Sequence, residues 1–248
     1  MPSPTPRHSR SIARLTVLVA LSLVAPLFGA IGTTGQPASR PTSKPSTQAT
    51  SLPAPFKFEK EIRAMELADA KNPPPPGCVV FTGSSTIRRW TTLQKDFAGV
   101  PVVNHGFGGS MISDAVYFAD RLVACKPSTI VFYSGGNDIN ANRTPERVCA
   151  DFKAFVAKVR LSVPDVKIIF MGIGPSPKRW AQADRQKRAN QLIHDYIDAG
   201  SNMKYVEVWD EMLGPDGKPR EELYVADHHH NNAAGYEIRT AILKDYLK

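Results

Sequence analysis

A carboxylate and three histidines stand together near the end of the 248-residue chain, in the run Asp227-His228-His229-His230. Within this run, only Asp227 and His230 form a pair with i, i+3 spacing. A carboxylate so placed holds an imidazole in one tautomer and favours its protonated form, as a general base requires. A three-histidine metal patch and a solvated polar loop are the alternatives, but adjacent histidines rarely all point at one ion.

A serine that such a pair could activate lies in the segment Thr82-Gly83-Ser84-Ser85-Thr86, directly after the apolar run 79–81. On a turn from strand to helix, the Ser85 hydroxyl is exposed, and the free N–H groups of the helix start can stabilise an oxyanion. Taken alone, the segment is also typical of a serine that caps a helix.

Two further polar turns contain glycine. Residues 104–110 include Gly106, Gly108 and Gly109, and glycine lets backbone N–H groups approach a ligand closely. The run Gly135-Gly136-Asn137-Asp138 follows another apolar run, so that Asn137 can direct its amide into a cleft. Each segment by itself is equally well explained as a tight turn.

The elements that must position these residues alternate from residue 56 onward. Short apolar runs at 79–81, 100–103, 130–133, 166–171 and 205–208 predict strands. Apolar stripes at helical spacing occupy 58–65, 112–123, 148–159, 192–197 and 238–246, with Thr144-Pro145 as a helix start. This alternation favours a parallel sheet covered on both faces, whose functional loops follow the carboxyl ends of the strands.

Taken together and in this order, the four polar segments resemble the blocks of the SGNH (GDSL-type) hydrolase family, over roughly residues 78–247. Gly83-Ser84-Ser85 is similar to the first block, with Ser85 in the position of the nucleophile. Gly109 matches the glycine of the second block, residues 135–138 form a G-x-N-D block, and Asp227 with His230 form the D-x-x-H block.

The resemblance implies an α/β protein with a three-layer, flavodoxin-like fold of about five parallel strands. It also implies a catalytic triad of Ser85, His230 and Asp227, and an oxyanion hole made by Ser85, Gly109 and Asn137. Neither a metal nor a cofactor is required by this chemistry.

Three positions depart from the usual family pattern. Ser84 stands where the first block commonly has aspartate, as in a GSS-type variant, and adds a second candidate hydroxyl. His228 and Asn231 replace a common glycine and leucine, which affects the rim of the site rather than the triad. The chain has no G-x-S-x-G segment, which argues against the ordinary α/β-hydrolase fold.

The N-terminal region reads as an export signal followed by a linker. Arg7, Arg10 and Arg14 precede an uncharged apolar run at 15–30, and small residues follow at 30–32. We therefore expect a signal peptide at 1–32, with an uncleaved anchor as the alternative. A Pro/Ser/Thr-rich linker at 33–55 and a hydrolase domain at 56–248 follow, in an exported protein that is periplasmic or secreted.

Charge and cysteine content limit the partners. The net charge is +8, but residues 52–248 carry 26 basic and 23 acidic residues, so nucleic-acid binding is not expected. A stable membrane contact is expected only if the signal is uncleaved. One pair among Cys78, Cys125 and Cys149 could form a disulfide in an oxidising compartment, and the sequence does not say which. The oligomeric state is not determined.

For the substrate, the sequence favours a small-molecule or glycan ester with a short acyl group, acetyl foremost. The longest connection, 209–227, is too polar for an apolar lid. Trp180, His228 and His229 are candidates for a rim that suits a polar alcohol, although Trp180 is equally explained as packing. The alternatives are a lysophospholipase or thioesterase for longer acyl chains, and a non-catalytic module that binds a glycan or a partner.

Overall fold

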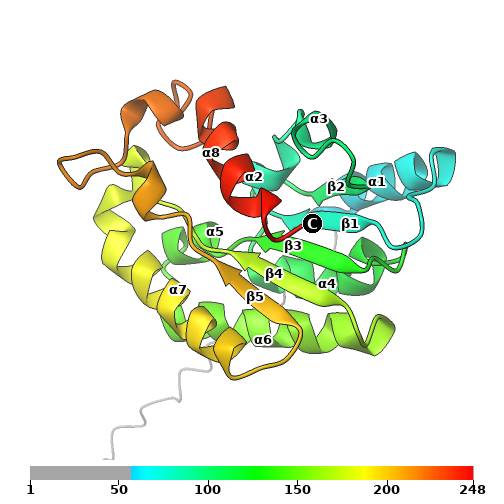
Figure 1. Ribbon diagram of the computed structural model, residues 1–248. Coiled ribbons are helices and arrows are strands. Elements are labelled where there is room, and N and C mark those ends of the chain that lie inside the picture. The colour runs from blue at the N-terminus through cyan, green and yellow to red at the C-terminus, as the bar shows by residue number, and fades with distance from the viewer. Residues whose placement is uncertain (1–56, 248) are drawn as a thin grey trace, which may run out of the picture. The chain divides into compact units, whose positions relative to one another are not determined.

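Five short parallel strands form one sheet in the order β2-β1-β3-β4-β5 (Figure 1). They are seen in a computed structural model of the chain, which describes residues 57–247. The strands are β1 (Val79–Gly83), β2 (Val102–Gly106), β3 (Thr129–Tyr133), β4 (Lys167–Met171) and β5 (Met203–Val206). The α/β fold with five parallel strands is thereby confirmed, whereas the signal peptide at 1–32 and the linker at 33–55 lie outside the described residues.

Helices cover both faces of the sheet (Figure 1). One face carries α1 (Glu59–Lys71), α4 (Ile112–Leu122), α6 (Pro145–Ser162) and α7 (Ala183–Asp198). The other carries α2 (Ser85–Arg88), α3 (Leu93–Asp96) and α8 (Ala233–Lys244). Shorter helical turns complete the elements of the described residues: α5 (Gly136–Asn140) and the 3₁₀ helices η1 (Pro177–Gln182), η2 (Asp210–Met212) and η3 (Glu221–Leu223).

Apolar side chains fill the two spaces between sheet and helices. In β3, Ile130 and Phe132 pack toward α4 and α6, while Val131 between them packs toward the opposite layer. Successive side chains of a strand point to opposite faces, so a strand buried on both sides must be apolar throughout. This explains why the central strands appear in the sequence as short continuous apolar runs.

Two strands are shifted relative to the apolar runs that predicted them. The second strand was expected at 100–103 and occupies Val102–Gly106, so it includes the polar Asn104 and His105. The fifth was expected at 205–208 and occupies Met203–Val206, while Val208 is buried beyond its end. The backbone of β2 pairs with β1, and that of β5 pairs with β4. This pairing, rather than the apolar character of the residues, determines where the two strands begin and end.

The first three strands end at the same level of the sheet. Gly83 at the end of β1 is in register with Gly106 of β2 and with Tyr133 of β3. A Cβ on Gly83 would lie 2.0 Å from the Tyr133 carbonyl oxygen, and the φ angle of Gly83 is +128°, so only glycine fits there. The loops after these strands are joined by hydrogen bonds from Phe107 N–H to the Gly83 carbonyl (3.0 Å) and from Ser84 N–H to the Tyr133 carbonyl (3.0 Å).

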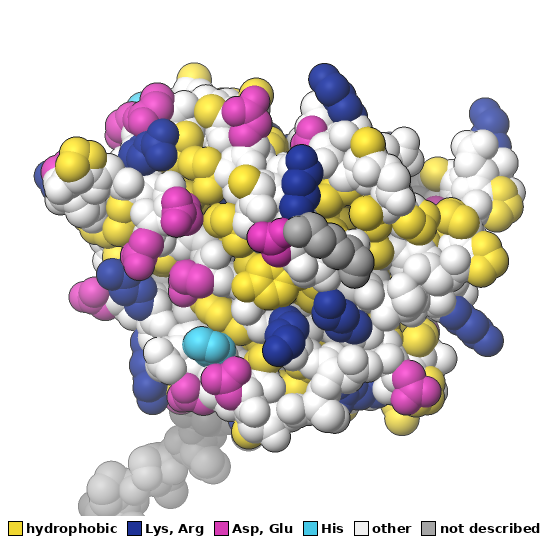
Figure 2. Space-filling view, viewed as in Figure 1, with side chains coloured by type: hydrophobic (Ala, Val, Ile, Leu, Met, Phe, Trp, Pro, Cys, Tyr) yellow, Lys and Arg dark blue, Asp and Glu magenta, His cyan; other side chains and the backbone are white. Residues whose placement is uncertain are grey.

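The surface and the cysteines bear on the expected partners and disulfide. On the face seen in Figure 2, basic and acidic side chains are intermingled. No helix within 57–247 is long and apolar enough to cross a membrane.

The Cys78 and Cys125 sulfurs lie 3.6 Å apart, whereas the Cys149 thiol is directed to the Leu192 carbonyl at 3.4 Å. The fold therefore singles out one cysteine pair where the sequence left three possibilities.

Candidate active site

Ser85 is the first residue of the single-turn helix α2, directly after β1. The Ser84 carbonyl accepts hydrogen bonds from the N–H groups of Ile87 (3.0 Å) and Arg88 (3.2 Å), which closes the turn. This leaves Ser85 half-buried, with its Oγ 2.9 Å from His230 Nε2. Of the two adjacent serines, it is Ser85 that meets the imidazole.

His230 and Asp227 lie in a tight turn before α8. The Asp227 Oδ2 atom is 2.6 Å from His230 Nδ1, and its Oδ1 accepts the backbone N–H groups of His229 and His230, each at 2.9 Å. The turn is held because Val225 N–H donates to the His230 carbonyl at 2.9 Å. The carboxylate, imidazole and hydroxyl thus form one continuous chain, in which the imidazole can pass a proton to or from Ser85.

The hydrogen bonds to Asp227 determine its charge. Partial burial by itself would raise the pKa of this carboxyl. The N–H and imidazole of His230, followed by the N–H of His229, outweigh that effect and hold the pKa well below its usual range. Asp227 is therefore ionised at neutral pH and can stabilise a positive charge on His230.

Asn137 lines one pocket together with Ser85, and Gly109 lies in the loop after β2. Asn137, in α5 after β3, donates from Nδ2 to the Ser110 carbonyl at 2.9 Å, and its Oδ1 accepts from Arg179 Nη2 at 2.9 Å. Gly109 stands beside Ser110 with a φ angle of +75°. One N–H of the Asn137 amide is thus occupied by Ser110, and the second is available to the pocket that Asn137 and Ser85 both line.

The family of the chain follows from a sequence match. A model of the GDSL-like lipase/acylhydrolase family matches residues 75–238. The chain belongs to this family. Acylhydrolases of this kind cleave ester bonds, and the protein is accordingly an ester hydrolase. The suspected relationship is thus confirmed, while the GSS-type variant of the first block stays an interpretation.

Known proteins of this class resemble the chain at low identity. Platelet-activating factor acetylhydrolase IB subunit alpha1 of Bos taurus is 24% identical over 181 residues, 68% of this chain and 74% of that protein. A GDSL-like lipase from Bacteroides thetaiotaomicron VPI-5482 has a TM-score of 0.63 at 19% identity, covering 75% of this chain and 96% of that one. A carbohydrate esterase family 3 protein from Talaromyces cellulolyticus has a TM-score of 0.50 at 18% identity, covering 68% and 96%. These structural likenesses support the fold.

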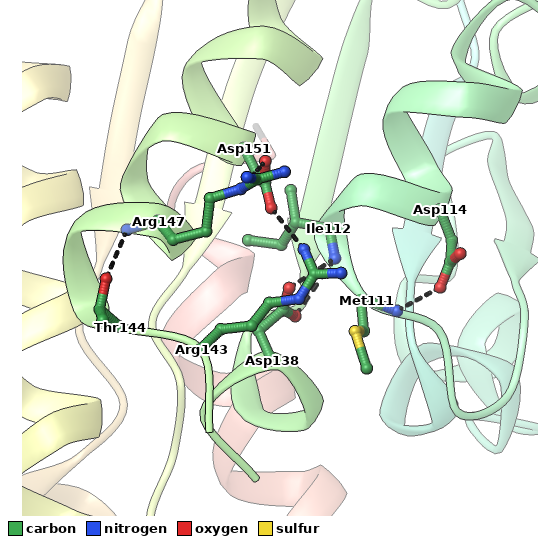
Figure 3. Close-up of polar contacts among 8 residues, drawn as sticks. All are labelled: Met111, Ile112, Asp114, Asp138, Arg143, Thr144, Arg147 and Asp151. Carbon is green, nitrogen blue, oxygen red and sulfur yellow. Dashed lines mark hydrogen bonds and ion pairs between the residues drawn. The ribbon is translucent and has the colours of Figure 1, made fainter. Parts of the chain in front are cut away.

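Asp138 has a different role in this acylhydrolase from its neighbour Asn137. Its side chain is fully buried and points at the start of α4, where Ile112 N–H donates to it at 3.2 Å (Figure 3). Desolvation raises the pKa of Asp138 to about 7. The hydrogen bond from Ile112 N–H and then the Arg143 charge oppose this rise in part, while the charge of Asp151, which pairs with Arg143 at 2.9 Å, adds to it. Asp138 thus ties the α5 turn to α4 and fixes the backbone that carries Asn137.

The pocket beside Ser85 is small and polar. It contains about 310 Å³ of space, open solvent at its mouth included. Its polar lining comes mainly from Ser85, Tyr133, Asn137, Arg179, Gln186 and His229, with Ile173 as the largest apolar member. Tyr133, Ile173 and Gln186 were not predicted as site residues. Tyr133 ends the apolar run of β3, Ile173 is an apolar residue in the loop after β4, and Gln186 is on the buried face of α7, so none of them stands out by residue type.

The three predicted rim residues have separate environments. His229 lines the pocket, contacts Ser176 Oγ at 3.1 Å, and has a pKa lowered to about 3 by burial and by the Arg179 charge, so it is neutral. His228 is exposed and its Nδ1 meets Glu221 at 2.7 Å. Trp180 packs against Trp209, with 6.1 Å between ring centroids. The histidines of the run face different partners, and within 57–247 no group of three or more His, Cys, Asp or Glu is placed to hold a metal.

Proposed function

We propose that the protein hydrolyses carboxylic esters through an acyl-enzyme on Ser85. The observation that carries the proposal is the continuous contact from Ser85 Oγ to His230 Nε2 (2.9 Å) and from His230 Nδ1 to Asp227 (2.6 Å). With its Nδ1–H donated to the carboxylate, His230 has a free lone pair at Nε2. It can therefore take the proton from Ser85 as the serine oxygen attacks the ester carbonyl.

The tetrahedral intermediate places negative charge on the former carbonyl oxygen. The backbone N–H groups of Ser85 and Gly109 and the free N–H of Asn137 are the donors we assign to it. Protonated His230 then gives its proton to the departing alcohol, and the acyl group remains on Ser85. A water molecule deprotonated by His230 attacks this acyl-enzyme, releases the acid and restores the serine.

The substrate we propose is a short acyl ester, acetyl foremost, such as an O-acetylated carbohydrate. A long acyl chain gains about 0.8 kcal/mol for each buried CH₂, and this requires an apolar pocket. The pocket beside Ser85 is instead small and lined mostly by polar groups. The names of an acetylhydrolase and a carbohydrate esterase among the similar proteins support this choice. A lysophospholipase or thioesterase is the alternative within the family.

A fluorophosphonate probe tests the reaction class. We expect covalent labelling of Ser85, loss of labelling in Ser85→Ala, and labelling retained in the neighbouring Ser84→Ala. If the folded wild-type protein is not labelled and hydrolyses no ester, the non-catalytic module that binds a glycan or partner becomes the better account.

Chain-length dependence tests the substrate class. The measurement is kcat/KM for p-nitrophenyl esters of two to twelve carbons, beside release of acetate from acetylated sugars. We expect the highest values for the shortest esters. A steady rise beyond eight carbons would favour the lysophospholipase alternative.

We also propose that the protein is exported and acts in the periplasm or outside the cell. The basic flank, the uncharged run at 15–30 and the Pro/Ser/Thr-rich stretch support this proposal. N-terminal sequencing of protein from the native host should find a start near Thr33. Recovery of residues 1–32 in a membrane fraction would indicate an uncleaved anchor.

A further inference from the structure

Arg179 stands out in the candidate active site because its charge has no counterion. Its side chain is partly buried and lines the pocket together with Ser85 and Asn137. Among residues 57–247, no carboxylate oxygen lies within 4.0 Å of its guanidinium; the hydrogen bond that it makes is to the amide oxygen of Asn137, at 2.9 Å. Burying a cation without an anion costs free energy, so a group that stays there requires a compensating interaction.

The contact with Asn137 fixes the orientation of the amide. An amide side chain can turn over and exchange its oxygen and nitrogen, which would point the carbonyl rather than the N–H into the pocket. Arg179 can only donate, so it holds the Oδ1 end, while the Ser110 carbonyl can only accept and holds one N–H at 2.9 Å. The direction of the second N–H of the Asn137 amide is thereby fixed. A cation at the oxygen end also polarises the amide and strengthens that N–H as a donor.

The segment that carries Arg179 is built onto the loop that carries His230. Lys178 N–H donates to the His228 carbonyl at 3.0 Å, Ser176 Oγ contacts His229 at 3.1 Å, and the Tyr224 hydroxyl donates to the Pro175 carbonyl at 2.6 Å. The segment 175–179 therefore contacts both the loop that carries the base and, through the Arg179 guanidinium, the oxyanion donor Asn137.

We propose that Arg179 is a positioning residue of the oxyanion hole, which orients Asn137 and supplies a positive charge that is balanced when the oxyanion forms. The inference rests on the proposed esterase function, because it assigns a role in the same reaction. A charge compensated only in the transition state raises kcat and leaves substrate binding largely unchanged.

The test compares Arg179→Ala and Arg179→Lys with the wild-type protein on p-nitrophenyl acetate. We expect kcat to fall about tenfold to a hundredfold in Arg179→Ala, below the roughly 10²–10³-fold loss of an oxyanion donor itself, with KM within about threefold. Lysine keeps the charge without the planar fork, so Arg179→Lys should be intermediate. Added guanidinium, at concentrations that leave the fold intact, should restore part of the activity of Arg179→Ala.

Arg185→Ala is the matched control, because Arg185 also links this side of the molecule to the loop after α5, through the Arg143 carbonyl at 2.7 Å and Asn142 at 3.4 Å. It should lose little activity and gain none from guanidinium. Binding of phenylboronic acid, which forms a tetrahedral anion on an active serine, should weaken in Arg179→Ala in proportion to the loss of kcat.

Three results would overturn the proposal. The first is a kcat of Arg179→Ala within twofold of wild type, and the second is a variant in which only KM changes. The third is a folded Arg179→Ala whose activity guanidinium does not restore and which binds the boronate as tightly as wild type. If Arg179→Ala does not fold, the same readouts on Arg179→Lys decide. Failure of the proposed function is distinct, since the wild-type protein would then be neither active nor labelled at Ser85.

Discussion

Two aspartates flank the candidate site, and the structure gives them opposite electrostatic characters. Asp227 is partly exposed and accepts three hydrogen bonds of 2.6–2.9 Å, two from backbone N–H groups and one from an imidazole. Asp138 is fully buried and is contacted by one backbone N–H, at 3.2 and 3.4 Å from its two oxygens. The pKa of Asp227 lies well below its usual range, whereas that of Asp138 is raised to about 7.

The difference shows that the number and quality of hydrogen bonds, together with access to water, determine what a carboxyl group can do. The negative charge of Asp227 can stabilise a positive charge on the His230 imidazole. Asp138 is poised between its charged and neutral forms at physiological pH, so it suits a structural link to α4 better than a role in charge stabilisation. Asp138 ends the G-x-N-D block and Asp227 begins the D-x-x-H block. Because both are aspartates, their different pKa values come from their surroundings.

The largest expected effect is the difference in kcat between Asp227→Asn and Asp138→Asn. Replacement of Asp227 by asparagine removes the charge and disturbs the imidazole tautomer, and we expect kcat to fall by about 10⁴-fold, as a triad carboxylate implies. Asp138→Asn keeps an oxygen that can accept from Ile112, and weakening that one hydrogen bond by roughly 1 kcal/mol should cost less than tenfold. Both are measured with p-nitrophenyl acetate at saturating substrate.

The order of these two losses is the decisive outcome. If Asp138→Asn proves as inactive as Asp227→Asn while remaining folded, the contrast between a charged and a structural aspartate is wrong. Circular dichroism and thermal melting of both variants serve as the control for folding.

The next effect concerns stability as a function of pH. The folded-state pKa of Asp138 is raised from 3.8 to about 7, so between these values the native state binds more protons than the unfolded state. Its contribution to stability therefore falls as pH rises, by at most about 1.4 kcal/mol per pH unit. Urea unfolding at pH 5 and pH 8 should show Asp138→Asn gaining on the wild type at the higher pH.

Asp227 should give the opposite sign. Its folded-state pKa is lowered, so its stabilisation is present above the unfolded value near 4 and is lost as pH falls below it. Asp227→Asn should consequently flatten the acid limb of the stability profile and leave the range from pH 5 to 8 unchanged. A gain for Asp227→Asn at pH 8 like that of Asp138→Asn would contradict the assignment.

A smaller effect is expected from the two other histidines of the run. Asp227 accepts from the backbone N–H of His229, not from its ring, so His229→Ala leaves the hydrogen bonds of the carboxylate in place. His228 contacts Glu221 at the surface. Each alanine variant should keep at least about a tenth of wild-type turnover, a loss of no more than about 1.4 kcal/mol. Chelator should leave activity intact, and rescue of a chelated, inactive enzyme by a divalent ion would refute this.

The smallest effect on turnover is expected at the cysteine pair, away from both aspartates. Treatment with oxidised glutathione should link Cys78 to Cys125, with the oxidant taking up the two electrons, because their sulfurs are 3.6 Å apart. A bond across about fifty residues typically adds 2–4 kcal/mol to stability. Thiol titration should then find one free cysteine instead of three, with unchanged kcat, and Cys78→Ser should abolish the gain. Three free thiols after oxidation would show that the pair does not bond.

Local patterns in the sequence were sufficient for much of the fold and for the candidate residues. The apolar runs identified all five strands, and Thr144-Pro145 marked the start of α6, where Thr144 accepts from Arg147 N–H at 3.2 Å. They failed at the ends of β2 and β5, where pairing with a neighbour extended or moved the strand. The pocket residues Gln186 in α7 and Ile173 in the loop after β4 had no sequence signal, because a buried residue has the same type whether or not it borders a cavity.

The sequence by itself determined the family, the parallel α/β architecture and the side chains available for chemistry, because these depend on residue type and on spacing along the chain. The tertiary structure decided which serine meets His230 across 145 positions, which end of the Asn137 amide Arg179 holds, and which two cysteines are neighbours. It also decided that Asp227 is charged while Asp138 is not fully so. Each of these depends on distances between segments remote in sequence and on the exclusion of water. A local sequence pattern determines neither the distances nor the burial.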